Sequence, residues 1–338
     1  MDPAFYKDHT TSRGYNYHYY RVLPKDNNIN LVFIHGFPST SHDWRLIVPY
    51  FQEEGYGIIV PDMLGYRGTD KPTNFREYQY SLLTRDVVDI MDQEGVERAV
   101  AIGHDWGAHV VSRFSNFFPE RFLAYATLSL PYHFPRTDFE MESFMASTKE
   151  AVGYEPFGYW YFFAEEGAAK IIEENMESFL AIMFPQDLSW VRSTFNDRGG
   201  VKAALLRKHK TALQGFMTEE EQKIFAETFW KGGLAAPLSY YTIMVTGARN
   251  EDDAKIPESR RIPPLSSPLF FGAGLKDGVC HPTYGKAEMT REELKNHNVT
   301  IREFDGDHWI MLSPDTADKI NQELELWIEN VVLNRQRA

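Results

Sequence analysis

The sequence predicts an α/β fold in which a mostly parallel central sheet is flanked by helices and interrupted by a helical lid. Short aliphatic runs without polar alternation occur towards both ends of the chain, as strands buried on both faces of a parallel sheet require. Between these regions the pattern changes to helices rich in aromatic residues, methionine and glutamate. We therefore expect a first core part at 1–133, a lid at 134–260 and a second core part at 261–338.

The expected elements follow from hydrophobic runs and from the turn and capping residues that bound them. The buried strands are expected at residues 31–34, 58–60, 99–102, 124–128, 269–271 and 299–301. The clearest helices are expected at residues 82–94, 108–118, 218–230 and 314–333. Thr218 begins a capping-box pattern, and Pro314 stands at the first position of the last helix.

Composition restricts the class of protein. The chain has 338 residues, of which 43% are hydrophobic, so a large core can be buried. Its net charge of −13 argues against nucleic acid or an anionic membrane as a partner. Cys280 is the single cysteine, which fits a reducing compartment. No segment has the roughly 20 apolar residues of a membrane span. We expect a cytoplasmic protein, monomeric or dimeric, without stable membrane insertion.

The segment Gly103-His104-Asp105-Trp106-Gly107 has the spacing of a Gly-x-nucleophile-x-Gly turn between a strand and a helix. Such a turn is tight, so its flanking positions must be small, and the nucleophile projects near the positive end of the following helix. Asp105 is ionised at pH 7 and needs no base to attack a carbon atom directly and form an ester. The alternative interpretation is an aspartate that caps the helix.

An acid and a histidine are expected after the nucleophile in the chain order of such enzymes. Asp277 follows one late strand and His308 follows the next, at the sheet edge where ligands bind. His308 would remove a proton from water, and Asp277 would orient it. A turn role for Asp277 remains open, because Asp305 and Asp307 lie closer to His308 in sequence.

Backbone groups near the nucleophile complete the expected site. His35-Gly36-Phe37-Pro38 follows the first parallel strand, where such enzymes take one donor of their oxyanion hole. The N–H groups of Phe37 and Trp106 would bind the oxygen that becomes negative as the ester is hydrolysed. The pair Cys280-His281 has no second pair elsewhere, so we expect no metal site.

These segments resemble epoxide hydrolases of the α/β-hydrolase superfamily, and the resemblance extends over nearly the whole chain. It implies the α/β-hydrolase fold with a helical lid and hydrolysis of an epoxide without a cofactor. The motifs that carry the resemblance are His35-Gly36-Phe37-Pro38, Trp44-Arg45, Pro61-Asp62-Met63-Leu64-Gly65-Tyr66, Gly103-His104-Asp105-Trp106-Gly107 and Phe118-Pro119-Glu120-Arg121.

The resemblance also implies two lid tyrosines that protonate the epoxide oxygen. A phenol with a pKa near 10 can donate to a leaving alkoxide and stay protonated at pH 7. Tyr159 takes the first position, with Tyr161 and Tyr154 as competitors. Tyr241 takes the second, and Tyr240 competes with it. The family usually has glycine before the catalytic histidine, where this chain has Asp307; that residue would raise the pKa of His308 or point to solvent.

Two other functions remain as alternatives. Haloalkane dehalogenases share the aspartate nucleophile and bind halide through the following tryptophan, here Trp106. They usually place asparagine where Phe37 stands, and Phe37 has no side-chain donor. A non-catalytic ligand-binding protein of the same fold would have no use for a charged carboxylate in an apolar pocket.

The predicted reaction converts a hydrophobic epoxide and water to a vicinal diol through an ester on Asp105. Water activated by His308 would then hydrolyse that ester. The apolar pocket that favours an aromatic or fatty substrate is expected from Trp44, Trp106, Phe157, Trp160 and Phe163.

Overall fold

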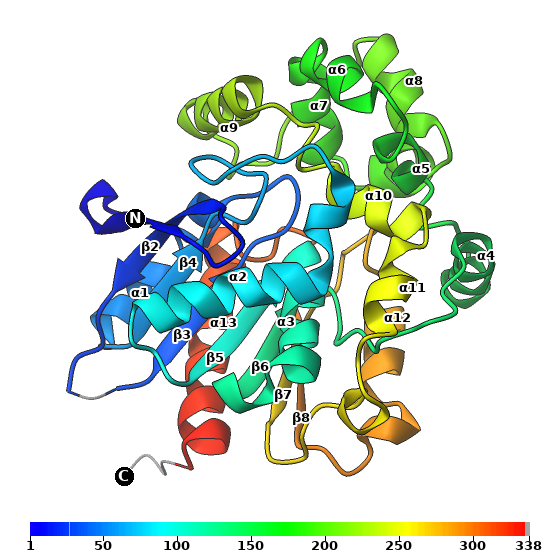
Figure 1. The fold of residues 1–338 in the computed structure, drawn as a ribbon. Coiled ribbons are helices and arrows are strands. Elements are labelled where there is room, and N and C mark those ends of the chain that lie inside the picture. The colour runs from blue at the N-terminus through cyan, green and yellow to red at the C-terminus, as the bar shows by residue number, and fades with distance from the viewer. Residues whose placement is uncertain (27, 335–338) are drawn as a thin grey trace.

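The computed structural model describes residues 1–26 and 28–334 and is built around an eight-stranded sheet (Figure 1). The strands follow the spatial order β1-β2-β4-β3-β5-β6-β7-β8, and those from β4 to β8 run parallel. The strands are β1 (Tyr6–Thr10), β2 (Asn16–Val22), β3 (Asn30–Ile34), β4 (Gly57–Pro61), β5 (Ala99–His104), β6 (Phe122–Leu128), β7 (Leu269–Gly274) and β8 (Val299–Phe304). The predicted mostly parallel sheet is confirmed.

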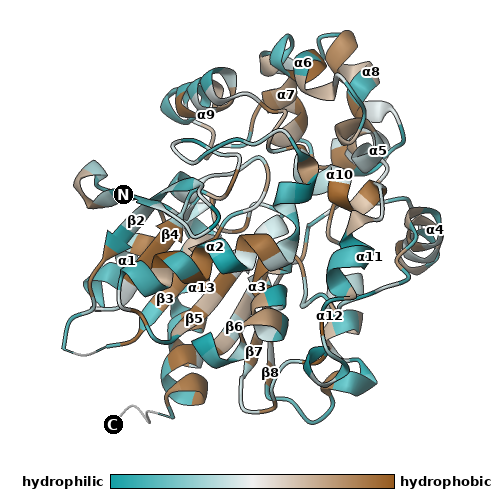
Figure 2. Ribbon diagram, viewed as in Figure 1, coloured by the Kyte–Doolittle hydropathy of each residue, from teal (hydrophilic) through white to brown (hydrophobic). Residues whose placement is uncertain are grey.

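Every residue of β4, β5 and β7 is buried, which explains why these segments lack polar alternation. Helices α2 (Tyr80–Gln93) and α3 (Trp106–Phe117) cover one face of the sheet, and α13 (Pro314–Trp327) lies behind it (Figure 1). In Figure 2 the central strands carry the brown of hydrophobic residues. The remaining helices of the core are α1 (Val48–Glu53) and α12 (Pro282–Met289).

The hairpin of β1 and β2 was not expected from the sequence. Both strands are antiparallel to their neighbours and extend the sheet beyond β4. Tyrosines such as Tyr17 and Tyr19 replace the aliphatic run of a buried strand, because they bury their rings while their hydroxyls donate to carboxylates. The Tyr17 hydroxyl lies 2.9 Å from Asp86, and that of Tyr19 lies 2.7 Å from Glu94.

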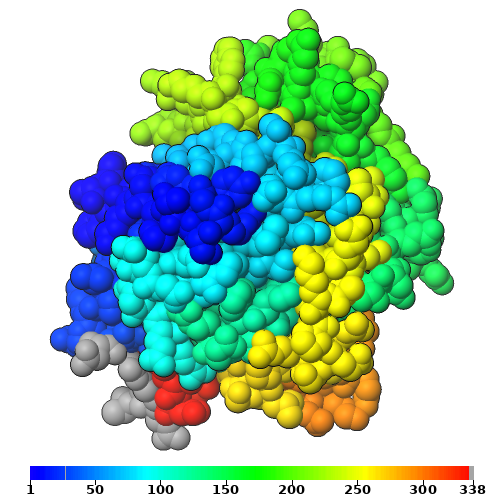
Figure 3. All heavy atoms as spheres, viewed as in Figure 1, coloured from blue at the N-terminus to red at the C-terminus, as the bar shows by residue number. Residues whose placement is uncertain are grey.

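Helices dominate the chain between β6 and β7, and they cover the end of the sheet at which the parallel strands terminate (Figures 1 and 3). Residues 134 and 260, the expected limits of the lid, fall in the connections before α4 and after α11; as domain limits they stay a prediction. The helices are α4 (Met141–Val152), α5 (Tyr159–Phe163), α6 (Ala168–Glu173), α7 (Met176–Met183), α8 (Gly200–Leu206), α9 (Glu219–Gly232), α10 (Ser239–Val245) and α11 (Ala248–Asp253).

The capping-box pattern at Thr218 is only half formed. The Thr218 hydroxyl accepts the N–H of Glu221 at 3.3 Å and caps α9 as expected. The carboxylate of Glu221 turns instead to Arg45 of the core, with its Oε1 2.8 Å from Arg45 Nε. Glu221 therefore ties the lid to the core rather than closing the box. Among the described residues, no helix is long and apolar enough to cross a membrane.

Candidate active site

The turn after β5 presents Asp105 at the start of α3. Asp105 has φ 52° and ψ −125°, a backbone conformation that residues other than glycine rarely adopt. The glycines around it are required by close approach. A Cβ on Gly107 would lie 2.1 Å from the oxygen of Ile34, and one on Gly36 would lie 2.4 Å from Asp105 Oδ1. The structure thus has the strained turn that the motif predicts, while the role of Asp105 as a nucleophile stays a prediction.

His308 and Asp277 lie together although 31 residues separate them. His308 Nδ1 is 2.9 Å from Asp277 Oδ2. The other oxygen of Asp277 accepts the N–H groups of Val279 and Cys280 at 2.8 and 2.7 Å. Asp277 is fully buried. These bonds fix its carboxylate, which in turn holds the His308 ring at its Nδ1 edge. Asp305 instead pairs with Lys276 at the surface.

The opposite ring nitrogen of His308 points to Asp105. His308 Nε2 lies 3.5 Å from Asp105 Oδ2. The backbone oxygen of His308 accepts hydrogen bonds from His104 Nε2 at 2.8 Å and from the Ser129 hydroxyl at 2.9 Å. Burial lowers the pKa of His104 to about 4, so this imidazole is neutral at pH 7. It fixes the loop that carries His308.

The charges of these groups are coupled. Burial alone acts to raise the pKa of Asp105, but the hydrogen bond and positive charge of His308 outweigh it and lower that pKa. Burial acts to lower the pKa of His308, and the charge of Asp277 together with hydrogen bonds to Asp105, Asp277 and Cys280 raises it well above its usual value. Asp105 is therefore ionised, and a cationic His308 between two carboxylates is stabilised.

A backbone N–H already lies against the nucleophile. Phe37 N donates to Asp105 Oδ1 at 2.9 Å. Trp106 is the first residue of α3, and the first N–H groups of a helix have no partner within the helix. His35 supports the Phe37 loop, because its Nε2 accepts the N–H of Met63 at 2.9 Å and its Nδ1 bonds the oxygen of Gly36. Both expected donors of the oxyanion hole therefore adjoin Asp105.

Tyr159 and Tyr241 line the same cavity as Asp105 and His308. Their ring centroids are 5.9 Å apart, and the rings are inclined at 70°. Burial raises the pKa of both phenols well above 10, and the charge of Asp105 adds to it. Both hydroxyls therefore stay protonated at neutral pH.

The competing tyrosines have other partners. Tyr240 packs against Tyr78, and its hydroxyl donates to the oxygen of Leu64 at 3.3 Å. The Tyr154 hydroxyl donates to the oxygen of Gly278 at 2.7 Å. Tyr161 binds Glu142 at the surface. Consecutive residues of a helix point about 100° apart, which places Tyr240 and Tyr241 in different environments.

The predicted pocket residues fall into three places. Trp44 is fully buried in the core, where its ring centroid lies 5.0 Å from that of Phe33, so its assignment to the pocket is wrong. Trp106 and Phe163 pack behind Tyr241 at centroid distances of 5.0 and 4.8 Å.

Phe157 and Trp160, the other two predicted pocket residues, line a second cavity. Aliphatic and aromatic lid residues that the sequence analysis did not single out line the cavity of Asp105: Ile182, Met183, Leu188, Val191 and Phe195. Their sequence pattern is that of any buried helix face, so it carried no signal of a binding role.

Asp307, which stands where the resemblance expects glycine, neither points freely to solvent nor contacts His308 directly. Its Oδ2 accepts Gln214 Nε2 at 2.6 Å, and its Oδ1 accepts the N–H of Trp309 at 3.0 Å. Gln214 comes from the lid. Asp307 thus connects the lid to the loop of His308 and lines the cavity.

Asp277, Cys280 and His308 each place a possible metal-ligand atom within 4.8 Å of the others. These atoms already have partners, since Asp277 binds His308 through Oδ2 and backbone N–H groups through Oδ1. The hydrogen bonds are those of an acid–base pair. The described residues therefore offer an arrangement for proton transfer beside a carboxylate nucleophile.

A strained carboxylate above a parallel sheet, with a histidine–aspartate pair and a lid, defines a hydrolase-like fold and site. The sequence profile described as alpha/beta hydrolase fold matches residues 29–315. The chain belongs to this family.

Proteins similar to this chain include several named epoxide hydrolases. Bifunctional epoxide hydrolase 2 of Sus scrofa is 28% identical over 305 residues, which cover 89% of this chain and 51% of the relative. The chain spans about half the length of the mammalian relatives that it matches. Epoxide hydrolase B of Mycobacterium tuberculosis is 25% identical over 344 residues, covering 91% of this chain and 94% of the relative.

Solved structures share the whole fold. An epoxide hydrolase from an endophytic Streptomyces superposes with a TM-score of 0.77 at 21% identity and covers 98% of this chain and 97% of that one. Epoxide hydrolase A from Mycobacterium thermoresistibile gives a TM-score of 0.74 at 24% identity, with 94% and 96% covered. At these identities the likeness shows the fold alone.

Proposed function

We propose that this protein is an epoxide hydrolase, which opens a hydrophobic epoxide with Asp105 and releases a vicinal diol. The observation that carries the proposal is a single cavity, which the carboxylate of Asp105 and the phenols of Tyr159 and Tyr241 line together. A nucleophile that forms an ester and acids that protonate a leaving alkoxide are the two groups that ring opening needs. The relatives named epoxide hydrolase support the same function.

In the first step an oxygen of Asp105 attacks an epoxide carbon. The C–O bond of the ring breaks, and its oxygen takes a proton from Tyr159 or Tyr241. Burial keeps both phenols protonated, since it raises the pKa of each. The products of this step are a hydroxyalkyl ester on Asp105 and a tyrosinate that awaits a proton.

In the second step water attacks the carbonyl carbon of the Asp105 ester. Esterification removes the negative charge of Asp105, which is one cause of the raised pKa of His308. The pKa of His308 therefore falls and its proton passes to the tyrosinate, so that the neutral ring can take a proton from the attacking water. The N–H of Phe37 stabilises the negative oxygen of the tetrahedral intermediate. Collapse of the intermediate releases the diol and restores the carboxylate.

A single turnover in ¹⁸O-labelled water, with enzyme in excess over styrene oxide, tests the ester route. The first diol is expected to contain unlabelled oxygen from Asp105, and the label is expected to appear in the protein. Full labelling of the diol in the first turnover would exclude a covalent ester. Asp105→Ala is expected to abolish diol formation.

The same assay separates epoxide hydrolysis from dehalogenation. Halide release from a 1-haloalkane needs donors for the halide, and Phe37 offers only its backbone N–H, which already binds Asp105. Haloalkanes are therefore expected to be unreactive where styrene oxide is turned over; the opposite result would favour a dehalogenase. A cytoplasmic location, supported by the single cysteine, remains part of the proposal.

A further inference from the structure

The cavity that Asp105 and His308 line is called the catalytic cavity below. A second cavity, lined in part by Arg249, lies against its walls, and we call it the Arg249 pocket. Three of its lining residues are close in sequence to proposed catalytic ones: His109 follows Asp105 by one helical turn, Met244 follows Tyr241 by about one turn, and Trp160 adjoins Tyr159. A fourth, Cys280, contacts His308. The rings of Trp160 and Tyr241 are 6.2 Å apart. An elongated substrate with its epoxide at Asp105 has this pocket beside it.

Most of the Arg249 pocket is apolar. Phe144 and Phe157 stack at a centroid distance of 5.3 Å, and Phe157 contacts Trp160 at 4.9 Å. Such walls suit a hydrocarbon chain or an aromatic ring. The pocket also has a polar part, to which His109, His133, Arg136, Arg249 and Glu288 contribute.

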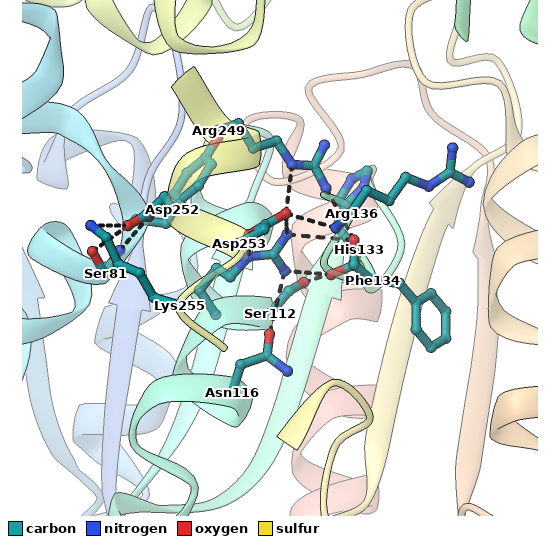
Figure 4. A network of polar contacts seen from close by, with 12 residues as sticks. Ser81, Ser112, Asn116, His133, Phe134, Arg136, Arg249, Asp252, Asp253 and Lys255 are labelled. Atoms are coloured by element: carbon teal, nitrogen blue, oxygen red, sulfur yellow. Dashed lines mark hydrogen bonds and ion pairs between the residues drawn. The ribbon is translucent and has the colours of Figure 1, made fainter. Parts of the chain in front are cut away.

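The polar part contains more buried positive than negative charge. Arg113 and Arg249 share one carboxylate, that of Asp253. Figure 4 shows Arg249 beside Asp253. Arg113 and Asp253 are fully buried, and Arg249 is 3% exposed. A buried cation without a full counter-charge is costly. Carbonyl oxygens of His133 and Phe134 compensate part of this charge, but carry no full negative charge.

Arg249 is held rigidly with one nitrogen to spare. Its Nε lies 3.1 Å from Asp253 Oδ2, its Nη2 donates to the oxygen of Phe134 at 3.0 Å, and its guanidinium lies 5.2 Å from the ring centre of Phe139. Within residues 1–26 and 28–334, Nη1 has no hydrogen-bond partner. Within the same residues the side chain of Arg136 also has no hydrogen-bond partner. The bond from Arg136 to Asp253 is made by its backbone N–H. The buried His133 Nε2 is also unpaired.

The charges of the two cavities differ. Among the described residues, the catalytic cavity is lined by the carboxylates of Asp105 and Asp307. Its cations are already paired, Lys276 with Asp305 and His308 with Asp277. An anionic substrate group in the catalytic cavity is repelled by the two carboxylates that line it. Among the described residues that line the Arg249 pocket, the acid is Glu288, which lies 3.3 Å from Arg291 and is partly neutralised. An anionic substrate group is therefore favoured in the Arg249 pocket.

We propose that the Arg249 pocket binds a carboxylate at the end of an apolar arm of the substrate, with Arg249 and Arg136 as its cations. This inference rests on the proposed epoxide hydrolysis and names its substrate class: an epoxide linked through a hydrophobic spacer to an acid. Arginine suits this role, since its planar fork matches a carboxylate.

The experiment compares styrene oxides that carry a para-carboxyalkyl chain with their methyl esters, over increasing chain lengths. At the length that reaches the pocket, kcat/KM is expected to favour the acid by about fivefold or more. Arg136→Gln should reduce this preference by about threefold, and Arg249→Gln by about tenfold. Glu288→Gln should increase it, a direction that loss of folding does not produce.

Arg207→Gln is the matched control, because Arg207 is an exposed lid arginine outside both cavities. It makes the same change in net charge and should leave the preference unaltered. The inference is overturned if esters are preferred at every chain length, or if Arg136→Gln and Arg207→Gln behave alike. Hydrolysis of neither acid nor ester would overturn the proposed function itself, whereas normal ester hydrolysis without acid preference overturns this inference alone.

Discussion

At the scale of single residues, the two nitrogens of His308 divide the proposed chemistry. Nδ1 is bound to Asp277, and Nε2 faces Asp105 across 3.5 Å. This distance leaves Nε2 close to the carbonyl that water must attack. His308 therefore serves the second step more than the first, since an ionised Asp105 attacks without a base.

His308→Gln is expected to slow hydrolysis of the ester by a factor on the order of 10² to 10⁴, the usual range for loss of a general base. The ester should accumulate, and intact-protein mass spectrometry should find the enzyme heavier by one substrate molecule. The Asp105→Ala, His308→Gln double variant is the control and should gain no mass. An unmodified His308→Gln protein with full turnover would contradict the assigned role.

The neighbours Tyr240 and Tyr241 form a natural pair for comparison. Tyr241→Phe removes a hydroxyl from the catalytic cavity, so we expect kcat to fall by about tenfold or more, with Tyr159 still present. Tyr240→Phe removes only a bond to the oxygen of Leu64 and should retain most activity. Steady-state rates with styrene oxide decide, and equal losses in both variants would show that Tyr241 has no special role.

The raised pKa of His308 links stability to pH. Its folded pKa lies above the unfolded value of about 6.5. The charged pairing therefore stabilises the fold fully below pH about 6.5 and is lost as pH rises through the folded pKa. The melting temperature of the wild type minus that of His308→Gln should decrease as pH rises above about 6.5. A difference that grows with pH would contradict this coupling.

The candidate site shows what single residues reveal before a structure is known. The positions of Asp105, Asp277 and His308 follow from motif spacing and strand ends. The sequence predicts Asp277 as the orienting acid but leaves a turn role open, and the contacts show that Asp277 binds His308 whereas Asp307 binds Gln214. Trp44 shows the converse error: a large aromatic side chain suits a core as well as a pocket.

At the scale of elements, one salt-bridge cluster joins α3, α11 and the segment after β6. Arg113 of α3 binds Asp253 of α11 through Nε at 2.7 Å and the oxygen of His133 through Nη1 at 2.7 Å. The backbone N–H of Arg136 donates to Asp253 at 2.8 Å. Both ends of the lid segment are thus bound to the same core helix.

Asp253→Asn is expected to destabilise the protein by about 3 to 5 kcal/mol, because it leaves Arg113 and Arg249 buried without their carboxylate. Urea unfolding measures the loss. Asp252→Asn is the neighbouring control. Asp252 also binds Ser81 and Lys255, but Lys255 is half exposed, so a smaller loss is expected. Equal losses would show that the shared carboxylate has no special importance.

Among elements, the parallel strands were predictable and the β1–β2 hairpin was not. Continuous burial of β4, β5 and β7 leaves aliphatic runs that are visible in the sequence. In the hairpin, Tyr17 and Tyr19 supply buried rings while their hydroxyls reach acids in and just after α2. That combination has no hydrophobic run, and its partners are distant in the chain. The helical character of the lid and the helix at 218–230 were predictable, but the other lid helices and the faces that meet the catalytic cavity were not.

At the scale of the whole molecule, lid and core share one continuous hydrophobic cluster. Trp106 of the core contacts Trp160 of the lid at a centroid distance of 5.1 Å. We therefore expect one cooperative unfolding transition for the whole protein. Far-ultraviolet circular dichroism and tryptophan fluorescence should give the same midpoint in urea. Separate midpoints would show that the lid unfolds independently.

The joint at Asp253 also bears on how such proteins diversify. Both ends of the lid segment meet at one core helix, so the long intervening stretch forms a closed loop on the core. Exchange of this loop between relatives could alter substrate choice while β5, β7 and β8 keep Asp105, Asp277 and His308 in place. A donor loop would need an acid at the Asp253 position to match Arg113. One carboxylate would thus govern which lids are interchangeable.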